Sequence, residues 1–139
     1  MGRSASGVRG IRLKPNDQVI GMSVITQTKQ APGTKLLIVT ENGFGKMTNI
    51  KEYRLQSRGG SGIKTAKVTS KNGQVVWAWI LNPDKLPEDK EGDLMIISNQ
   101  GQVIRLPLKS VPTTGRSTQG VRLMRFKEKD DRVASVTLV

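Results

Sequence analysis

The sequence predicts an all-β fold assembled from repeated four-stranded units. The chain of 139 residues repeats itself at offsets of 55 and 58 residues. Its apolar runs are short, rich in Val and Ile, and bounded by Asn-Gly, Gly-Gly or Pro, which is typical of strands and turns. No long amphipathic helical pattern is present. Units of this kind build radial β-propellers, and two and a half of them cannot close a ring.

Three copies of one motif mark the starts of the repeats. They are residues 3–8 (RSASGV), 58–63 (RGGSGI) and 116–121 (RSTQGV). A second motif, residues 36–43 (LLIVTENG), aligns with residues 94–101 (LMIISNQG). We therefore expect one partial domain over residues 1–139, with repeats at about 3–57 and 58–115 and a partial repeat at 116–139.

Ten strands are expected, four in each full repeat and two in the partial one. The first repeat supplies Val8–Leu13, Gln18–Ile25, Lys35–Thr40 and Phe44–Asn49; the second supplies Ile63–Val68, Gln74–Leu81, Asp93–Ser98 and Gln102–Pro107; the third supplies Val121–Phe126 and Arg132–Leu138. The first strand of each repeat departs from strict alternation. A bulge at Arg9-Gly10, Lys64-Thr65 and Arg122-Leu123 would restore the pattern and place the basic residues on the outer face.

The charge of the chain indicates a polyanionic partner. The 23 Lys and Arg residues exceed the 11 Asp and Glu residues, which gives a net charge of +12 and a pI near 10.5. Most of the excess lies in residues 1–75, which hold 13 basic and 3 acidic side chains. Five acidic residues cluster in Asp84–Asp93 with two prolines. We interpret that stretch as a solvated loop facing away from the polyanion rather than as a metal site.

Several kinds of chemistry are excluded by residue type or spacing. Because the chain has no Cys and no His, it cannot form thiolate or imidazole metal sites, disulfides or a triad with a histidine base. The string Gly43–Thr48 lacks the spacing of a phosphate-binding P-loop, and we interpret it as a hairpin turn at Asn42-Gly43 that directs Lys46 outward. The sequence has no arginine–metal arrangement that would make Tyr53 a nucleophile, so we expect this side chain to have a packing role. The apolar runs are too short to span a bilayer. We expect no catalytic site, metal or cofactor, and an intracellular location.

Basic residues recur in columns when the repeats are aligned. The columns are Arg3/Arg58/Arg116, Arg9/Lys64/Arg122 and Arg12/Lys67/Arg125. Duplication alone could preserve such solvated charges, but the second repeat keeps the charge while changing Arg to Lys at two places. The glycines at 59–62 could form either a phosphate-binding nest or a flexible turn. The expected DNA contacts are Arg3, Arg9, Arg58, Lys64, Arg116 and Arg122, with Lys46 and Arg105 as weaker candidates on the hairpins.

Four strings together resemble the C-terminal domain of the DNA gyrase A subunit. They are residues 7–13 (GVRGIRL), 40–46 (TENGFGK), 52–63 (EYRLQSRGGSGI) and 115–123 (GRSTQGVRL). The resemblance covers essentially the whole chain and extends to the related domain of topoisomerase IV. It implies a β-pinwheel whose blades exchange strands and whose basic perimeter binds and bends duplex DNA. The resemblance also implies a sequence box of the form Gln-basic-basic-Gly-Gly-basic-Gly, which is central to DNA wrapping in this family. Residues 56–62 (QSRGGSG) are similar to this box but have Ser57 and Ser61 at two of its three basic positions.

The resemblance also implies the partners of the chain. These would be duplex DNA, the remainder of the gyrase A polypeptide and the gyrase B polypeptide, in the bacterial cytoplasm at the nucleoid. The catalytic tyrosine, the metal-binding carboxylates and the ATPase site of the enzyme would lie elsewhere. Two alternatives stay open: a basic RNA-binding or ribosome-associated β domain, and a protein-interaction propeller. Scarce aromatic residues and the absence of a recognition helix favour duplex backbone contact over base reading.

Overall fold

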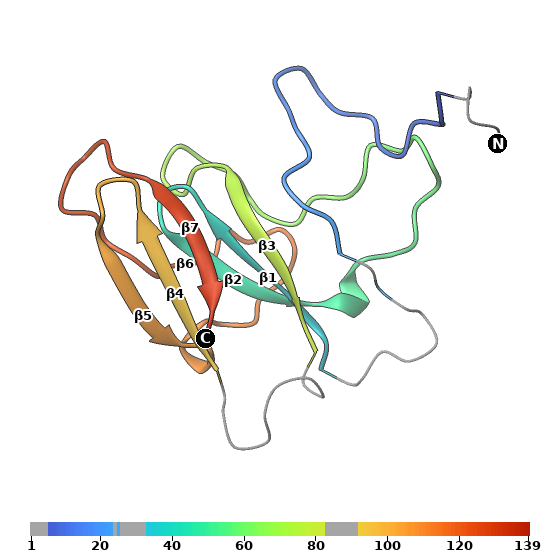
Figure 1. The fold of residues 1–139 in the computed structure, drawn as a ribbon. Helices are drawn as coiled ribbons and strands as arrows, with labels where there is room; N and C mark the ends of the chain where they lie inside the picture. Colours follow the sequence, from blue (N-terminus) through green and yellow to red (C-terminus); the bar gives the residue numbers. More distant parts are fainter. Residues whose placement is uncertain (1–5, 24, 26–32, 83–91) are drawn as a thin grey trace.

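Two antiparallel sheets form the body of the protein in a computed structural model, which describes residues 6–23, 25, 33–82 and 92–139 (Figure 1). The first sheet has the order β3-β1-β2-β6 and the second has the order β5-β4-β7. The strands are β1 (Lys35–Thr40), β2 (Phe44–Asn49), β3 (Val75–Leu81), β4 (Asp93–Ser98), β5 (Val103–Pro107), β6 (Val121–Arg122) and β7 (Val133–Leu138). Short 3-10 turns follow β2 (η1, Ile50–Glu52) and β5 (η3, Leu108–Ser110). The predicted all-β class is confirmed.

A hairpin from one repeat lies at the centre of each sheet. The β1–β2 turn closes with Gly43 at φ +85°, and its N–H donates to the Thr40 carbonyl at 3.1 Å. The β4–β5 turn closes in the same way, with Gly101 at φ +87° donating to Ser98. Glycine suits these positions because other residues rarely adopt positive φ. These four strands match the sequence prediction, apart from the first residue of β5, because strand and turn signals are both local.

The remaining strands come from later repeats. β3, the second strand of the second repeat, pairs with β1, and β6, the first strand of the third repeat, pairs with β2. β7, the second strand of the third repeat, pairs with β4 in the same manner. The rule is therefore that a hairpin receives one strand from the next repeat and one from the repeat after that. The strand exchange implied by the family resemblance is present.

The same rule explains three predicted strands that do not form. No strand is found over Val8–Leu13, over the described part of Gln18–Ile25, or over Ile63–Val68. By the rule, these segments would flank hairpins of repeats other than the two whose hairpins are seen, and no described strand pairs with them. A strand without a neighbour lacks its ladder of hydrogen bonds. Residues 6–23 and 53–70 accordingly run as strand-free segments beside the sheets (Figure 1).

The hydrophobic core fills the space between the two sheets. Leu37 and Val39 of β1 pack in one cluster with Leu94 and Ile96 of β4, and all four side chains are fully buried. Ile38, which aligns with Ile96 in the repeat, points to the opposite face of β1 because side chains alternate along a strand. One face of the second sheet therefore packs against the other face of the first. Successive sheets stack face to back, as blades of a propeller do.

Two glycines allow β6 to approach β2 closely. A Cβ atom on Gly45 would collide with Leu123 Cδ1 and lie 2.9 Å from the Ile38 carbonyl oxygen. A Cβ atom on Gly120 would lie 2.6 Å from the Gly45 carbonyl oxygen. Beyond β6, the N–H groups of Leu123 and Met124 both donate to the Gly43 carbonyl, as in a β-bulge. The bulge lies at Leu123-Met124, one residue beyond the predicted Arg122-Leu123. The side chains of Leu123 and Met124 are both buried.

Buried polar side chains hold the turns that precede β3 and β7. Asn72 accepts from the Thr69 N–H at 2.7 Å and donates to the carbonyls of Lys67 and Gln119. Asp131 accepts from the backbone N–H groups of Gln100 and Arg132, at 3.1 and 2.9 Å. Both side chains are buried. Each therefore joins one repeat to another through a turn.

The pKa of Asp131 reflects this hydrogen bonding. Burial of the carboxyl would raise its pKa, but the bonds from the Ser98 side chain and from the backbone of residues 99, 100 and 132 outweigh burial and lower the pKa below its ordinary value. A lowered pKa means that the folded state favours the charged carboxylate. Most of the acidic stretch Asp84–Asp93 lies outside the described residues. No helix in the described ranges is long and apolar enough to cross a membrane.

The packing of β6 predicts a large effect at Gly45. We expect Gly45→Ala to lower the free energy of unfolding by about 1–3 kcal/mol, because the added methyl group has no space. Gly115→Ala is the matched control, since its Cβ would meet only Glu52 Oε1 at an ordinary 3.6 Å. Urea unfolding of both variants measures the difference. Equal stabilities of the two variants would contradict the close approach.

The Asp131 contacts predict a pH-dependent stability. A lowered pKa stabilises the fold above the unfolded-state value of about 3.9, and this contribution disappears as the pH falls through the folded-state value. We expect Asp131→Asn to melt below the wild type at pH 7 and to approach it at about pH 3. Thermal unfolding between these pH values tests this, with Asp17→Asn as an exposed control. A constant difference in Tm would count against the assignment.

Candidate nucleic-acid interface

The segments that begin the repeats lie against one another in a repeated arrangement. The Arg12 N–H donates to the Gly60 carbonyl at 2.8 Å, and the Lys67 N–H donates to the Thr118 carbonyl at 3.0 Å. The second bond joins the residues that align with those of the first, 55 and 58 positions further on. Each full repeat therefore contacts the loop that begins the next repeat through the same main-chain bond. At each junction, a basic residue that follows the start of one repeat therefore lies near the arginine that begins the next.

Two pairs of predicted DNA contacts meet at these junctions. Arg9 and Arg58 flank the bond between the Gly59 N–H and the Gly10 carbonyl, which is 3.0 Å long. Lys64 and Arg116 meet directly, because the Arg116 Nη1 atom donates to the Lys64 carbonyl at 3.1 Å. We call the following set the basic rim: Arg9, Arg58, Lys64, Arg116 and Arg122. Arg116 is half-buried, and the other four side chains are exposed.

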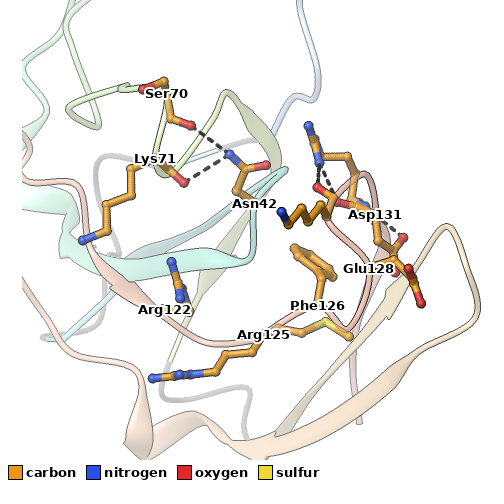
Figure 2. A pocket seen from close by; sticks show the side chains of 11 residues that line it. Asn42, Ser70, Lys71, Arg122, Arg125, Phe126, Glu128 and Asp131 are labelled. Carbon is orange, nitrogen blue, oxygen red and sulfur yellow. Dashed lines mark hydrogen bonds between the residues drawn. The ribbon is translucent and has the colours of Figure 1, made fainter.

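A groove of about 500 Å³ continues from Arg122 toward the second sheet (Figure 2). Arg122 Cζ lies 5.2 Å from the centroid of the Phe44 ring, and Lys71 Nζ lies 5.9 Å from the same centroid. The buried Phe44 ring thus carries two cations at cation–π distance. Asn42 Nδ2 donates to the carbonyls of Ser70 and Lys71, which fixes the turn that presents Lys71.

Cations outnumber anions around this groove. Its charged lining residues are Lys71, Arg122, Arg125, Lys129 and Arg132, against Glu128 and Asp131. The Asp131 carboxylate already accepts main-chain hydrogen bonds, and the dipoles of these N–H groups offset part of its negative charge. The groove is therefore a positively charged recess that can accept a phosphate group.

Four of the basic residues that line the groove are not part of the basic rim, and only one of these four belongs to a predicted column. Arg125 is part of the third basic column of the sequence, whereas Lys71, Lys129 and Arg132 lie in turns or strand ends outside the columns. The groove forms between turns that are about 30 to 90 residues apart in the chain. Spacing within a single repeat could not reveal it.

Lys46 does not occupy the outward position that the sequence suggested. Its side chain is fully buried, and its ammonium donates to the carbonyls of Gly115, Arg116 and Thr118. Burial lowers the pKa of Lys46, and the nearby Glu52 carboxylate opposes this shift. The predicted direction of the side chain is wrong because loop 115–118 covers it. Lys46 is not part of the basic rim.

The other predicted residues are placed as follows. Arg105 is exposed on β5, and its Nε atom forms an ion pair with Asp93 at 2.7 Å. Arg3 lies outside the described residues. Trp77 packs against the core, whereas Trp79, stacked beside it, is 50% exposed. Within the described ranges, no three Asp or Glu side chains gather as a metal site requires.

Comparison with known proteins gives consistent results. The family profile for the DNA gyrase C-terminal domain, beta-propeller, matches residues 1–26, 34–78 and 92–139. The A subunit of DNA gyrase from Staphylococcus aureus (strain MRSA252) is 42% identical over 139 residues, and that from Staphylococcus epidermidis (strain ATCC 12228 / FDA PCI 1200) is 42% identical over 126 residues. These alignments cover 100% and 91% of this chain. The chain spans only 14% and 13% of the two relatives.

Two solved structures share the fold. One, described as the structure of DNA gyrase A C-terminal domain, has a TM-score of 0.63 and 26% identity, and the match covers 75% of this chain and 33% of the other. The other, a crystal structure of the C-terminal domain of DNA topoisomerase IV, has a TM-score of 0.75 and 21% identity, with coverages of 94% and 37%. With its repeats, exchanged strands and matching profile, the chain belongs to the family of DNA gyrase C-terminal β-propeller domains.

Proposed function

We propose that this chain is a duplex-DNA-binding and bending module that acts without sequence specificity. The observation that carries the proposal is the repeated contact of Arg12 with Gly60 and of Lys67 with Thr118, which brings basic residues of successive repeats to the same junctions. A continuous row of cations can follow the phosphates of a curved duplex. Such contacts carry no sequence information, and the described residues contain no helix that could enter a major groove.

The proposal assigns the phosphate contacts to the basic rim and the adjoining groove. Smoothly bending a site of 20–30 base pairs costs on the order of 1–6 kcal/mol, so several contacts along the rim are needed to offset it. Arg3 is proposed as a further contact from the sequence column alone. Arg105 is a weaker contact, because its guanidinium is already paired with Asp93.

In this proposal the chain is a non-catalytic part of a larger enzyme. It would belong to the gyrase A polypeptide of an ATP-dependent type II topoisomerase in the bacterial cytoplasm, associated with the nucleoid. Its partners would be duplex DNA, the remainder of the gyrase A polypeptide and the gyrase B polypeptide. The chain itself would need no cofactor, and DNA cleavage and ATP hydrolysis would take place elsewhere in that assembly.

Duplex binding should depend steeply on salt concentration. If the five rim residues each neutralise one phosphate, log K should fall against log[salt] with a slope of about −4.5. Fluorescence anisotropy of a labelled duplex of about 40 base pairs measures this slope at three salt concentrations. A slope shallower than about −2 would reject the extended rim. Competition by single-stranded DNA and by duplex RNA distinguishes duplex DNA binding from an RNA-binding function.

Rim residues should contribute more to the salt slope of binding than other surface cations do. We expect Arg58→Gln and Arg122→Gln each to reduce the steepness of the salt slope by about 0.9, the value for one lost phosphate contact. Arg105→Gln removes the same charge from an ion-paired site and should change the slope less. Circular dichroism and melting temperature confirm that the variants fold. Equal slopes for all three variants would indicate only a general effect of net charge.

A further inference from the structure

The segment 112–122 lies along the outer edge of β2 in two limbs. In the first limb, the Met47 N–H donates to the Pro112 carbonyl and the Thr114 N–H donates to the Met47 carbonyl, both at 2.8 Å. The second limb is β6, which pairs antiparallel with Phe44 and Gly45. The position left between the two limbs belongs to Lys46. The loop that joins the limbs, residues 115–118, therefore passes over this side chain.

The Lys46 ammonium donates its hydrogen bonds to that loop. It lies 2.7 Å from the Gly115 carbonyl oxygen, 3.1 Å from that of Arg116, and 2.9 and 3.1 Å from the carbonyl and hydroxyl oxygens of Thr118. An ammonium group has three donor protons, so these four oxygens satisfy it completely. The side chain is fully buried. Each of these bonds joins residues 69 to 72 positions apart in the sequence.

The same loop determines where two rim residues point. Arg116 lies within it, and its guanidinium donates to the Lys64 carbonyl. Arg122 follows it on β6, which reaches β2 only after the loop has crossed Lys46. The Thr118 carbonyl that accepts from Lys46 also accepts from the Lys67 N–H. One buried ammonium thus touches the junction between the second and third repeats.

The second hairpin lacks an equivalent group. Val103 and Ile104 of β5 occupy the positions that align with Gly45 and Lys46 of β2. Val103 has a side chain where the first hairpin needs a glycine, and Ile104 has no donor for a loop of carbonyls. The feature is therefore particular to the β1–β2 hairpin and is not a general property of the sheets.

We propose that Lys46 is a positioning residue for DNA binding, which locks the exchanged loop 115–118 and thereby sets Arg116 and Arg122 on the basic rim. This inference rests on the proposed function, because its effect is read through duplex binding. Lys46 itself would not touch a phosphate. Loss of its ammonium would remove one hydrogen bond from each of the carbonyls of Gly115, Arg116 and Thr118, so that Arg116 would no longer have a fixed position.

The test is a double-mutant cycle in duplex DNA binding with the 139-residue chain. Lys46→Met, Arg116→Gln and the double variant are compared by anisotropy at 0.1 M salt. The control is Lys35→Met, which removes the same charge from a half-buried lysine that donates to Thr113 Oγ1 in the same segment. We expect Lys46→Met to weaken binding at least about eightfold, the loss of one contact at this salt concentration. The double variant should bind no more weakly than Lys46→Met alone.

Hydrogen exchange supplies a readout that does not depend on DNA. The Lys67 amide, which donates to the Thr118 carbonyl, should exchange faster in Lys46→Met, whereas the amides of β4 and β5 should not change. If Lys46→Met does not fold, Thr118→Val replaces it in the cycle, because this change removes one oxygen from the ammonium and leaves the lysine intact. Thr118 Oγ1 also bonds to the Gly115 carbonyl and to Thr114 Oγ1, so Thr114→Val, which removes the second of these loop bonds without touching the ammonium, is its control. Thr118→Val should then weaken duplex binding and speed exchange of the Lys67 amide, with smaller effects than those expected for Lys46→Met.

The possible outcomes are distinguishable. Multiplicative losses for Lys46→Met and Arg116→Gln, or equal losses for Lys46→Met and Lys35→Met, would overturn the positioning role. Unchanged exchange at the Lys67 amide would also overturn it. Failure of the wild-type chain to bind duplex DNA would instead reject the proposed function, and the hydrogen exchange result would still decide whether Lys46 locks the loop.

Discussion

The need of a β-strand for a hydrogen-bonded neighbour, which another repeat supplies for every described strand except β5, governs this structure. A hairpin of one repeat satisfies only its inner edges, and its two outer edges present unpaired N–H and C=O groups. Here β3 and β6 cover the outer edges of the β1–β2 hairpin, from the second and third repeats. The three predicted strands that remain without such a neighbour do not form. No repeat is therefore a self-contained folding unit, and the stability of each sheet depends on segments far apart in the sequence.

This constraint also explains why polar groups are buried at the junctions. Asn72, Asp131 and Lys46 are each buried, and each bonds to the main chain of another segment. An apolar side chain at these positions could not satisfy the main-chain groups of a passing loop. The hydrophobic core between the sheets supplies much of the stability. The buried polar groups determine which segment lies beside which.

The arrangement of the surface charges follows from the same junctions. Because each repeat contacts the next through an equivalent main-chain bond, the residues after the start of one repeat lie beside the loop that begins the next. Basic residues of different columns, such as Lys64 and Arg116, meet at these junctions. The groove beside Phe44 adds cations from turns of both sheets, so the positive surface is wider than the columns alone. Sequence-independent DNA binding needs this kind of extended, charged surface.

The sequence by itself determined the fold class, the period of the repeats, both central hairpins and the residues of the basic columns. These features depend on local patterns: turn glycines, runs of Val and Ile, and motifs that recur. Only the tertiary structure decided which repeat supplies the outer strands, that Lys46 is buried, and that Lys71, Lys129 and Arg132 line a groove. Those outcomes depend on contacts between segments tens of residues apart, and such contacts leave no periodic signal in a single sequence.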